Sequence, residues 1–166
     1  MILSQAEVRA AVQNGEIRFD PPLQEKQWGE ASVDLRLGNK FTKLKPSPGI
    51  KLSLALGIGT IADSGLWEED ELPLRDRFGK KRTFCLDPNE FVLGLTHEHI
   101  YMPRNLIAMV EGRSTYARVG LSMHQTAPWI QPGWDGKITL EIRNSGPLQI
   151  ELTPIEDMPC QLTFFR

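Results

Sequence analysis

The chain has 166 residues, with 19 Lys and Arg against 21 Asp and Glu, so its formal net charge is −2. This length predicts one domain over residues 1–166, large enough to hold a hydrophobic core without disulfides or structural metals. The near balance of charges argues against a sequence-independent nucleic-acid binder, which would carry a basic excess, so we expect small molecules or protein chains as partners.

A short helix is predicted at the start of the chain. Ser4 and Glu7 have the spacing of a capping box, apolar residues recur at helical spacing from Ala6 to Val12, and Asn14-Gly15 ends the pattern. Apolar and polar residues then alternate over residues 31–37. One strand face would carry Ala31, Val33, Leu35 and Leu37, and the other would carry Ser32, Asp34 and Arg36. This alternation predicts a half-buried strand.

The rest of the chain predicts a mainly β fold. Residues 46–82 are interrupted by many Pro and Gly residues and predict a long excursion with at most short strands. From residue 83 onward short strand-like runs recur between turn residues, at Phe91/Leu93/Leu95, Leu106–Val110, Ile138/Leu140/Ile142, Leu148/Ile150/Leu152 and Leu162/Phe164. Evenly spaced short strands of this kind are typical of an all-β barrel or sandwich.

A candidate anion-binding turn follows one of these strands. Residues 111–118, Glu-Gly-Arg-Ser-Thr-Tyr-Ala-Arg, combine a glycine, two hydroxyls and two arginines. Backbone N–H groups, hydroxyls and guanidinium groups all suit phosphate oxygens. The alternative is an ordinary turn with solvated arginines, since the Gly-Lys-Ser/Thr ending of a P-loop is absent.

Glu141 is the candidate acid/base. In the run 137–143, Ile138, Leu140 and Ile142 share one face of a strand, and Thr139 and Glu141 share the other. Glu141 is either a shielded catalytic carboxylate or an exposed residue paired with Lys137 or Arg143. Periodicity alone favours the exposed residue unless another subunit covers that face.

Several classes of site and location are not expected. His97 and His99 would share a strand face, but the pattern of a zinc nucleobase deaminase, His-x-Glu with Pro-Cys-x-x-Cys, is missing, so no zinc is predicted. Cys85 and Cys160 are predicted to be buried apolar residues. No apolar run approaches membrane-spanning or signal-peptide length, which predicts a cytoplasmic protein without a membrane partner.

Taken together, three segments resemble the dCTP deaminase family, part of the dUTPase-like superfamily. They are residues 31–41, residues 112–121, and residues 124–141 with His-Gln-Thr-Ala, Pro-Gly-Trp and Leu-Glu. The resemblance implies a dUTPase-like fold, a distorted β-barrel of the β-clip type, in a homotrimer whose active sites are shared between chains. It also implies zinc-independent hydrolytic deamination of dCTP to dUTP and ammonia, with Mg²⁺ held by the nucleotide phosphates rather than by protein ligands, and dTTP as a possible inhibitor.

The same resemblance implies roles for individual residues. Glu141 is the general acid/base, while Ser114 and Arg118, the latter from a neighbouring chain, position the attacking water and polarise the site. The backbone of Ala127 contacts the base. The implied substrate-binding set is Arg113, Ser114, Thr115, Tyr116, Ala117, Arg118, Ala127, Gln131, Thr139, Leu140 and Glu141.

Two other functions stay open. One is a dUTP diphosphatase or a bifunctional enzyme, an option that the Gln125 of His-Gln-Thr-Ala keeps alive. Gln131 stands where trimeric dUTPases have the aspartate that activates water, and Glu141 where they usually have an apolar residue, so both positions favour deamination. The other is a nucleotide-binding homologue without turnover, because the family's tail that closes over the triphosphate lies beyond the last residue here, Arg166.

Overall fold

Helix α1 (Gln5–Gln13) begins the chain as the sequence predicts. The backbone N–H of Ser4 donates to Oε2 of Glu7 at 2.8 Å, and the N–H of Glu7 donates back to Oγ of Ser4 at 3.4 Å, which completes the capping box. The helix ends at Asn14, and Val8 and Ala11 pack into the core. The structure is a computed structural model that describes residues 1–51, 53, 55 and 65–166.

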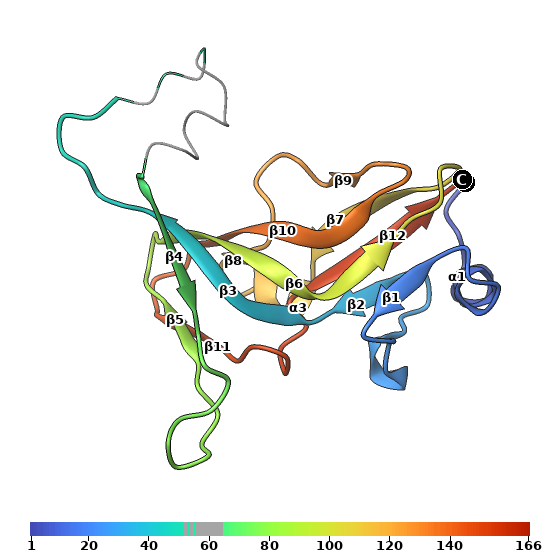
Figure 1. The fold of residues 1–166 in the computed structure, drawn as a ribbon, viewed down its shortest axis with the longest axis horizontal. Helices are drawn as coiled ribbons and strands as arrows, with labels where there is room; N and C mark the ends of the chain where they lie inside the picture. The colour runs from blue at the N-terminus through green and yellow to red at the C-terminus, as the bar shows by residue number, and fades with distance from the viewer. Residues whose placement is uncertain (52, 54, 56–64) are drawn as a thin grey trace.

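The strands of the described residues form three antiparallel sheets (Figure 1). The largest has the order β4 (Trp67–Glu71), β3 (Leu37–Leu44), β6 (Phe91–Tyr101), β10 (Asp135–Asn144) and β8 (Leu121–Ser122), with β1 (Arg18–Asp20) also paired to β6. The second contains β2 (Val33–Leu35), β12 (Cys160–Phe165), β7 (Ile107–Gly112) and β9 (Trp129–Ile130). The third pairs β11 (Ile150–Leu152) with β5 (Phe84–Leu86). The predicted mainly β fold with a short N-terminal helix is confirmed.

The core lies between the inner faces of these sheets. On β10 the predicted apolar face is buried, with Ile138, Leu140 and Ile142 each at most 2% exposed. The strand predicted around residues 91–95 is confirmed as part of β6. The buried residues of β6 are the even-numbered ones, such as Val92 and Ile100, so Phe91, Leu93 and Leu95 lie on the outer face. Burying each large apolar side chain contributes about 1.5–3 kcal/mol. Leu93 and Leu95 of β6 lie on the outer face and are not part of this core.

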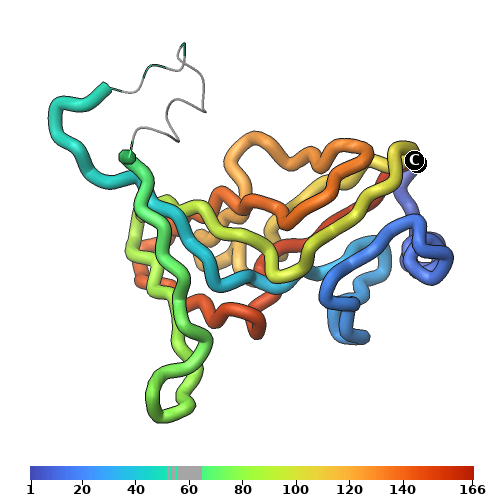
Figure 2. Tube along the Cα trace, in the orientation of Figure 1, coloured from blue at the N-terminus to red at the C-terminus, as the bar shows by residue number. Residues whose placement is uncertain are grey.

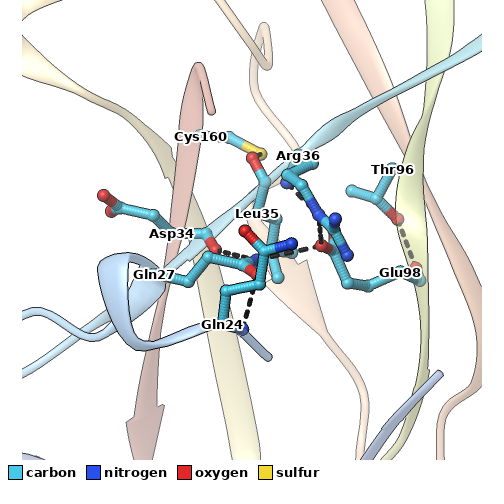
Figure 3. Close-up of polar contacts among 8 residues, drawn as sticks. All are labelled: Gln24, Gln27, Asp34, Leu35, Arg36, Thr96, Glu98 and Cys160. Atoms are coloured by element: carbon cyan, nitrogen blue, oxygen red, sulfur yellow. Dashed lines mark hydrogen bonds and ion pairs between the residues drawn. The ribbon is translucent and has the colours of Figure 1, made fainter. Parts of the chain in front are cut away.

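The strand predicted over residues 31–37 is buried on both faces rather than on one. It divides into β2 and the start of β3, and its polar residues Asp34 and Arg36 are only 9% and 5% exposed. Nε of Arg36 lies 2.6 Å from Oε1 of Glu98, and Nε2 of Gln27 donates to the same oxygen at 2.9 Å (Figure 3). Burial of these polar groups is possible because each charge has a partner.

Residues 65–86 connect β3 to the third sheet. β4 is a five-residue edge strand paired along its whole length with β3, as the predicted excursion with short strands allows. A hairpin follows, with Arg75 paired to Lys81 by an isolated bridge. It projects from the body of the chain in the tube view (Figure 2, green). Part of the predicted excursion, residues 52, 54 and 56–64, lies outside the described residues.

The two cysteines differ in environment. Cys160 on β12 is fully buried as predicted, but Cys85 on β5 is exposed, so that prediction is wrong. The reason is strand alternation: Phe84 and Leu86 face the core, which turns the residue between them outward. In the described part of the chain, no helix has the length and apolar character needed to cross a membrane.

Candidate active site

The predicted anion-binding turn forms where β7 ends. Arg113 is the N-cap of a four-residue helix, α3 (Ser114–Ala117), and its N–H donates to the carbonyl of Pro159 at 3.0 Å. Ser114 and Thr115 are exposed. The turn closes at Gly120, where φ is +93° and an added Cβ would lie 2.4 Å from the backbone nitrogen of Gly146. Only glycine fits this position, so the chain path that presents the two hydroxyls is fixed.

The Arg113 side chain is held by groups from two other segments. Its Nη1 lies 3.1 Å from Oδ2 of Asp34 on β2 and donates to the carbonyl of Met158 at 3.2 Å. Burial raises the pKa of Asp34 above its ordinary value, and the charge of Arg113 opposes this effect. Asp34, Arg113, Ser114 and Thr115 line one hollow of about 410 Å³. The structure therefore brings the guanidinium and the two hydroxyls together.

Tyr116 and Arg118 lie on the flanks of this turn. The half-buried Tyr116 hydroxyl donates to Oδ1 of Asp157 at 3.3 Å. Burial, together with the carboxylate of Asp157, raises the pKa of Tyr116 above its ordinary value. Ala117 and Arg118 line a second hollow of about 580 Å³ that also includes Leu148. Arg118 thus faces a different hollow from Ser114.

Glu141 lies on the outer face of β10, as the alternation predicts. Its Oε2 accepts a hydrogen bond from the backbone N–H of Gln125 at 2.7 Å, while the Gln125 side chain donates to the Glu141 carbonyl at 3.3 Å. Neither Lys137 nor Arg143 forms an ion pair with it in the part of the chain that the structure describes. The carboxylate is half-buried and oriented by the backbone.

The remaining predicted residues surround Glu141 in the sequence. Thr139 is exposed on the same face of β10, whereas the side chain of Leu140 is fully buried in the core, so Leu140 has only its backbone to offer a ligand. Ala127 and Gln131 are exposed on the segment that joins β8 to β10. Gln131 directly follows β9, where its carbonyl accepts the N–H of Trp134 at 3.1 Å.

Comparison with known proteins places the chain in a family. A family model described as dCTP deaminase-like matches residues 2–166. The chain belongs to the dCTP deaminase-like family. The resemblance predicted from the three segments is therefore confirmed.

Named members of the dCTP deaminase-like family match at equal identity. A protein of Methanosphaera stadtmanae named "dCTP deaminase, dUMP-forming" is 37% identical over 165 residues, covering 98% of this chain and 78% of the relative. A "dCTP deaminase" of Rhodospirillum rubrum is 37% identical over 156 residues, covering 93% of this chain and 77% of the relative. The crystal structure of 2′-deoxycytidine 5′-triphosphate deaminase from Agrobacterium tumefaciens has a TM-score of 0.70, at 21% identity, over 98% of this chain and 47% of that chain. This last match shows a shared fold.

In the part of this dCTP deaminase-like chain that the structure describes, no direct polar contact brings Glu141 together with the other two predicted catalytic residues. Among the described residues, no hydrogen bond or ion pair joins Glu141 to Ser114 or Arg118. Sequence reasoning also missed Asp34 and Asp157, which hold Arg113 and Tyr116. Asp34 lies in the first matching segment, but the alternation placed it on an exposed face. Asp157 has no local signal, because its contact with Tyr116 depends on where the segment before β12 lies.

The described residues contain no group of three or more His, Cys, Asp or Glu side chains arranged to hold a metal ion. Asp34, the carboxylate in the smaller hollow, is already paired with Arg113. The exposed hydroxyls of Ser114 and Thr115, which also line this hollow, suit phosphate oxygens better than a protein-bound cation.

Proposed function

We propose that the chain deaminates dCTP to dUTP and ammonia by zinc-independent hydrolysis. The observation that carries the proposal is the Glu141 carboxylate, half-buried on the outer face of β10 and oriented by the N–H of Gln125 at 2.7 Å. Membership of the dCTP deaminase-like family supports the nucleotide substrate. The bond that breaks is the exocyclic C–N bond at C4 of cytosine, and water supplies the oxygen that replaces the amine.

Glu141 acts as the proton shuttle in this proposal. It accepts a proton from water, and the resulting hydroxide adds to C4 of the base. Glu141 then transfers the proton to N4 and ammonia leaves. The proton of the added hydroxyl moves to N3, which gives the C4 carbonyl and the N3–H of uracil. A carboxylate held by one backbone N–H keeps its second oxygen available for this transfer. Because the hydrogen bond fixes the orientation, little reorganisation is needed in the transition state.

The turn after β7 binds the triphosphate. Arg113 supplies a guanidinium already oriented by Asp34 and Met158, and Ser114 and Thr115 supply hydroxyls. Tyr116 and Ala117 complete the wall of the cradle. Mg²⁺ accompanies the nucleotide on its phosphate oxygens and neutralises part of their charge, without a dedicated set of protein ligands.

Assembly from more than one copy completes the site. Within one chain, Arg118 lines a different hollow from Ser114. In the proposed homotrimer, Arg118 reaches the Glu141 of a neighbouring copy. The backbone of Ala127 contacts the base, Gln131 hydrogen-bonds the deoxyribose, and Thr139 and Leu140 flank Glu141. We place this activity in the cytoplasm, with dTTP as a candidate inhibitor at the same site.

A dUMP-forming enzyme is the second candidate. It is favoured by the relatives named "dCTP deaminase, dUMP-forming", which match as well as those named "dCTP deaminase". Hydrolysis at phosphorus needs a base for the attacking water, and the neutral amide of Gln131 cannot act as one. Because position 131 carries an amide rather than a carboxylate, deamination alone is the primary proposal.

One experiment separates these functions. The purified protein is incubated with dCTP or dUTP and Mg²⁺, and both the nucleotide products and ammonia are measured. We expect dCTP to become dUTP while added dUTP stays intact. Release of dUMP and pyrophosphate would establish the dUMP-forming reaction instead. Nucleotide binding without any product would replace both proposals with a binding protein.

A further inference from the structure

A basic hairpin projects from the chain between β4 and β5. Residues 75–82 contain the basic side chains Arg75, Arg77, Lys80, Lys81 and Arg82 and a single acid, Asp76. Oδ1 of Asp76 accepts the N–H groups of Phe78 at 2.8 Å and Lys80 at 2.9 Å, and its carbonyl accepts the N–H of Gly79 at 3.0 Å. The tip is therefore a closed turn of defined shape.

This hairpin, which we call the basic hairpin, presents an aromatic ring to solvent. Phe78 at its tip is 79% exposed, and the guanidinium of Arg77 lies over the ring, 4.7 Å from its centroid. Within the described residues, Arg77, Lys80 and Arg82 form no ion pair. A closed turn that exposes a large apolar side chain among cations without an ion-pair partner is suited to a partner with an apolar, acidic surface.

Such a surface exists on the same chain. A hollow of about 480 Å³, which we call the acidic hollow, lies on the outer face of the six-stranded sheet. Its rim includes Glu69, Asp70 and Glu71 of β4 together with Lys40 of β3, whose Nζ lies 3.4 Å from Oε2 of Glu71. Its lining includes Leu93 and Leu95 of β6. These are the outward-facing leucines that the core does not use.

Strand register ties the acidic hollow to Glu141. Glu69 pairs with Thr42, Thr42 with Leu93, and Leu93 with Glu141, which forms one row across four strands. Residues directly opposite one another on paired strands share a sheet face and lie ~5 Å apart. Thr139, which pairs with Leu95, lines the hollow itself. A partner seated there would cover the face that carries Glu141.

The basic hairpin of the same copy is held away from this hollow. Leu72, at its first leg, is buried and its N–H donates to the carbonyl of Asn39 at 2.9 Å. Nζ of Lys81, on its second leg, lies 2.9 Å from Oε1 of Glu156. With both legs fixed, the tip extends beyond the end of β4 into solvent (Figures 1 and 2).

We propose that the basic hairpin of one copy docks in the acidic hollow of a second copy. Phe78 inserts against Leu93 and Leu95, and the free cations of the tip face the acids of β4. The charges are complementary, because three cations without an ion-pair partner meet Glu69 and Glu71 on the outer face, although Glu71 already pairs with Lys40. Both halves of the contact occur on every chain. Such a head-to-tail contact closes into a ring when the rotation between copies permits. The inference rests on the proposed assembly of the active site from neighbouring chains and names the contact that covers Glu141.

Disulfide trapping tests this contact directly. In a Cys85→Ser background, one tagged chain carries Phe78→Cys and a differently tagged chain carries Leu95→Cys, and the two are co-expressed and oxidised. We expect a disulfide that joins the two tags. Leu148→Cys is the matched control, because Leu148 is 75% exposed but lines the other large hollow. Equal yields with Leu95→Cys and Leu148→Cys, or no cross-link with either, would overturn the proposal.

A charge exchange provides a second measurement without new thiols. Arg77→Glu places an acid against the acidic rim, and like charges across an interface oppose association. We expect the dissociation constant of the assembly, measured by sedimentation, to rise about tenfold or more. Addition of Glu69→Lys to the same chain should restore association, while Arg104→Glu, an exposed control, should leave it unchanged. An Arg77→Glu protein that associates like wild type contradicts the contact.

The experiments distinguish a failure of the hairpin contact from a failure of the proposed deaminase function. Both measurements are made without nucleotide, so a cross-link between Phe78→Cys and Leu95→Cys does not require turnover. Deamination of dCTP by a protein that shows no selective cross-link would remove the hairpin contact and leave the proposed function. A selective cross-link in a protein that forms no product would support the hairpin contact and remove the proposed function.

Discussion

Arg36 and Glu98 form an ion pair inside the protein, with Nε of Arg36 2.6 Å from Oε1 of Glu98 and no exposed surface on Glu98 (Figure 3). Oε2 of Glu98 also accepts the backbone N–H of Arg36 at 2.9 Å. The pair joins the start of β3 to β6 and fixes the strand segment that carries Asp34. Through Asp34, it supports the Arg113 side chain of the proposed triphosphate cradle.

Removal of one partner of the Arg36–Glu98 ion pair should therefore lower the stability of the protein strongly. Glu98→Ala leaves the Arg36 charge buried without a counterion, and we expect the free energy of unfolding to fall by about 3–5 kcal/mol. Urea denaturation at a fixed chain concentration measures the change. The control is Glu25→Ala, which removes the surface pair of Arg9 and Glu25 and should cost less than about 1 kcal/mol. Equal effects of the two substitutions would contradict a structural role for the buried pair.

The role of Glu141 is tested by Glu141→Gln. The amide keeps the shape and can still accept the N–H of Gln125, but it cannot shuttle a proton. We expect kcat for dCTP deamination to fall by about 100- to 10,000-fold while nucleotide binding is retained. Steady-state kinetics and isothermal titration calorimetry measure the two quantities. Turnover at the wild-type rate would remove Glu141 from the proposed mechanism.

Gln131→Asp tests the choice between the two chemistries. The substitution restores a carboxylate where dUTP diphosphatases carry one. We expect dUTP hydrolysis to stay below about 1% of the deamination rate, because a general base is effective only when it is positioned within hydrogen-bond reach of the water. Pyrophosphate release from dUTP measures this activity. A large gain would mean that the rest of the site already supports attack on phosphorus.

His97 should make stability depend on pH. Burial of the imidazole, with a further contribution from Arg36, lowers the pKa of His97 below its ordinary 6.5, although Glu98 opposes the shift and Lys137 adds to it. The unfolded chain therefore takes up a proton before the folded chain does. The stability contributed by neutral His97 is fully present above about pH 6.5 and is lost as the pH falls toward the lowered pKa.

The measurement is the unfolding free energy of wild type and His97→Gln at several pH values. We expect the difference between the two proteins to shift in favour of the variant as the pH falls from 7.5 to about 5. A difference that stays constant over this range would show that His97 does not titrate differently on folding.

The two thiols should react at very different rates. Burial raises the pKa of the Cys160 thiol far above its ordinary value, whereas Cys85 is exposed. Because the thiolate is the reactive form, we expect Ellman's reagent to label Cys85 in the folded protein and Cys160 only after denaturation. Cys85→Ser should abolish labelling of the folded protein. Prompt labelling of that variant would show that Cys160 is accessible.

Local patterns in the sequence determined several elements of this protein. The capping box of Ser4 and Glu7 predicts α1, and the alternation of Ile138, Leu140 and Ile142 predicts both β10 and the outward direction of Glu141. The family was also readable, because its matching segments are continuous. In each case the signal depends on residues a few positions apart, which share a helix turn or a strand face whatever the rest of the chain does.

The tertiary structure decided which polar groups are buried and which surfaces meet. Arg36 looked exposed because its partner, Glu98, is 62 positions away in the chain, and the burial of Asp34 likewise depends on Arg113. Cys85 looked like a core residue, but only one face of its strand is covered. The acidic hollow combines residues from β3, β4, β6 and β10, so no single segment carries its signature. Periodicity reports which side chains share a face, whereas what lies against that face depends on the path of the whole chain.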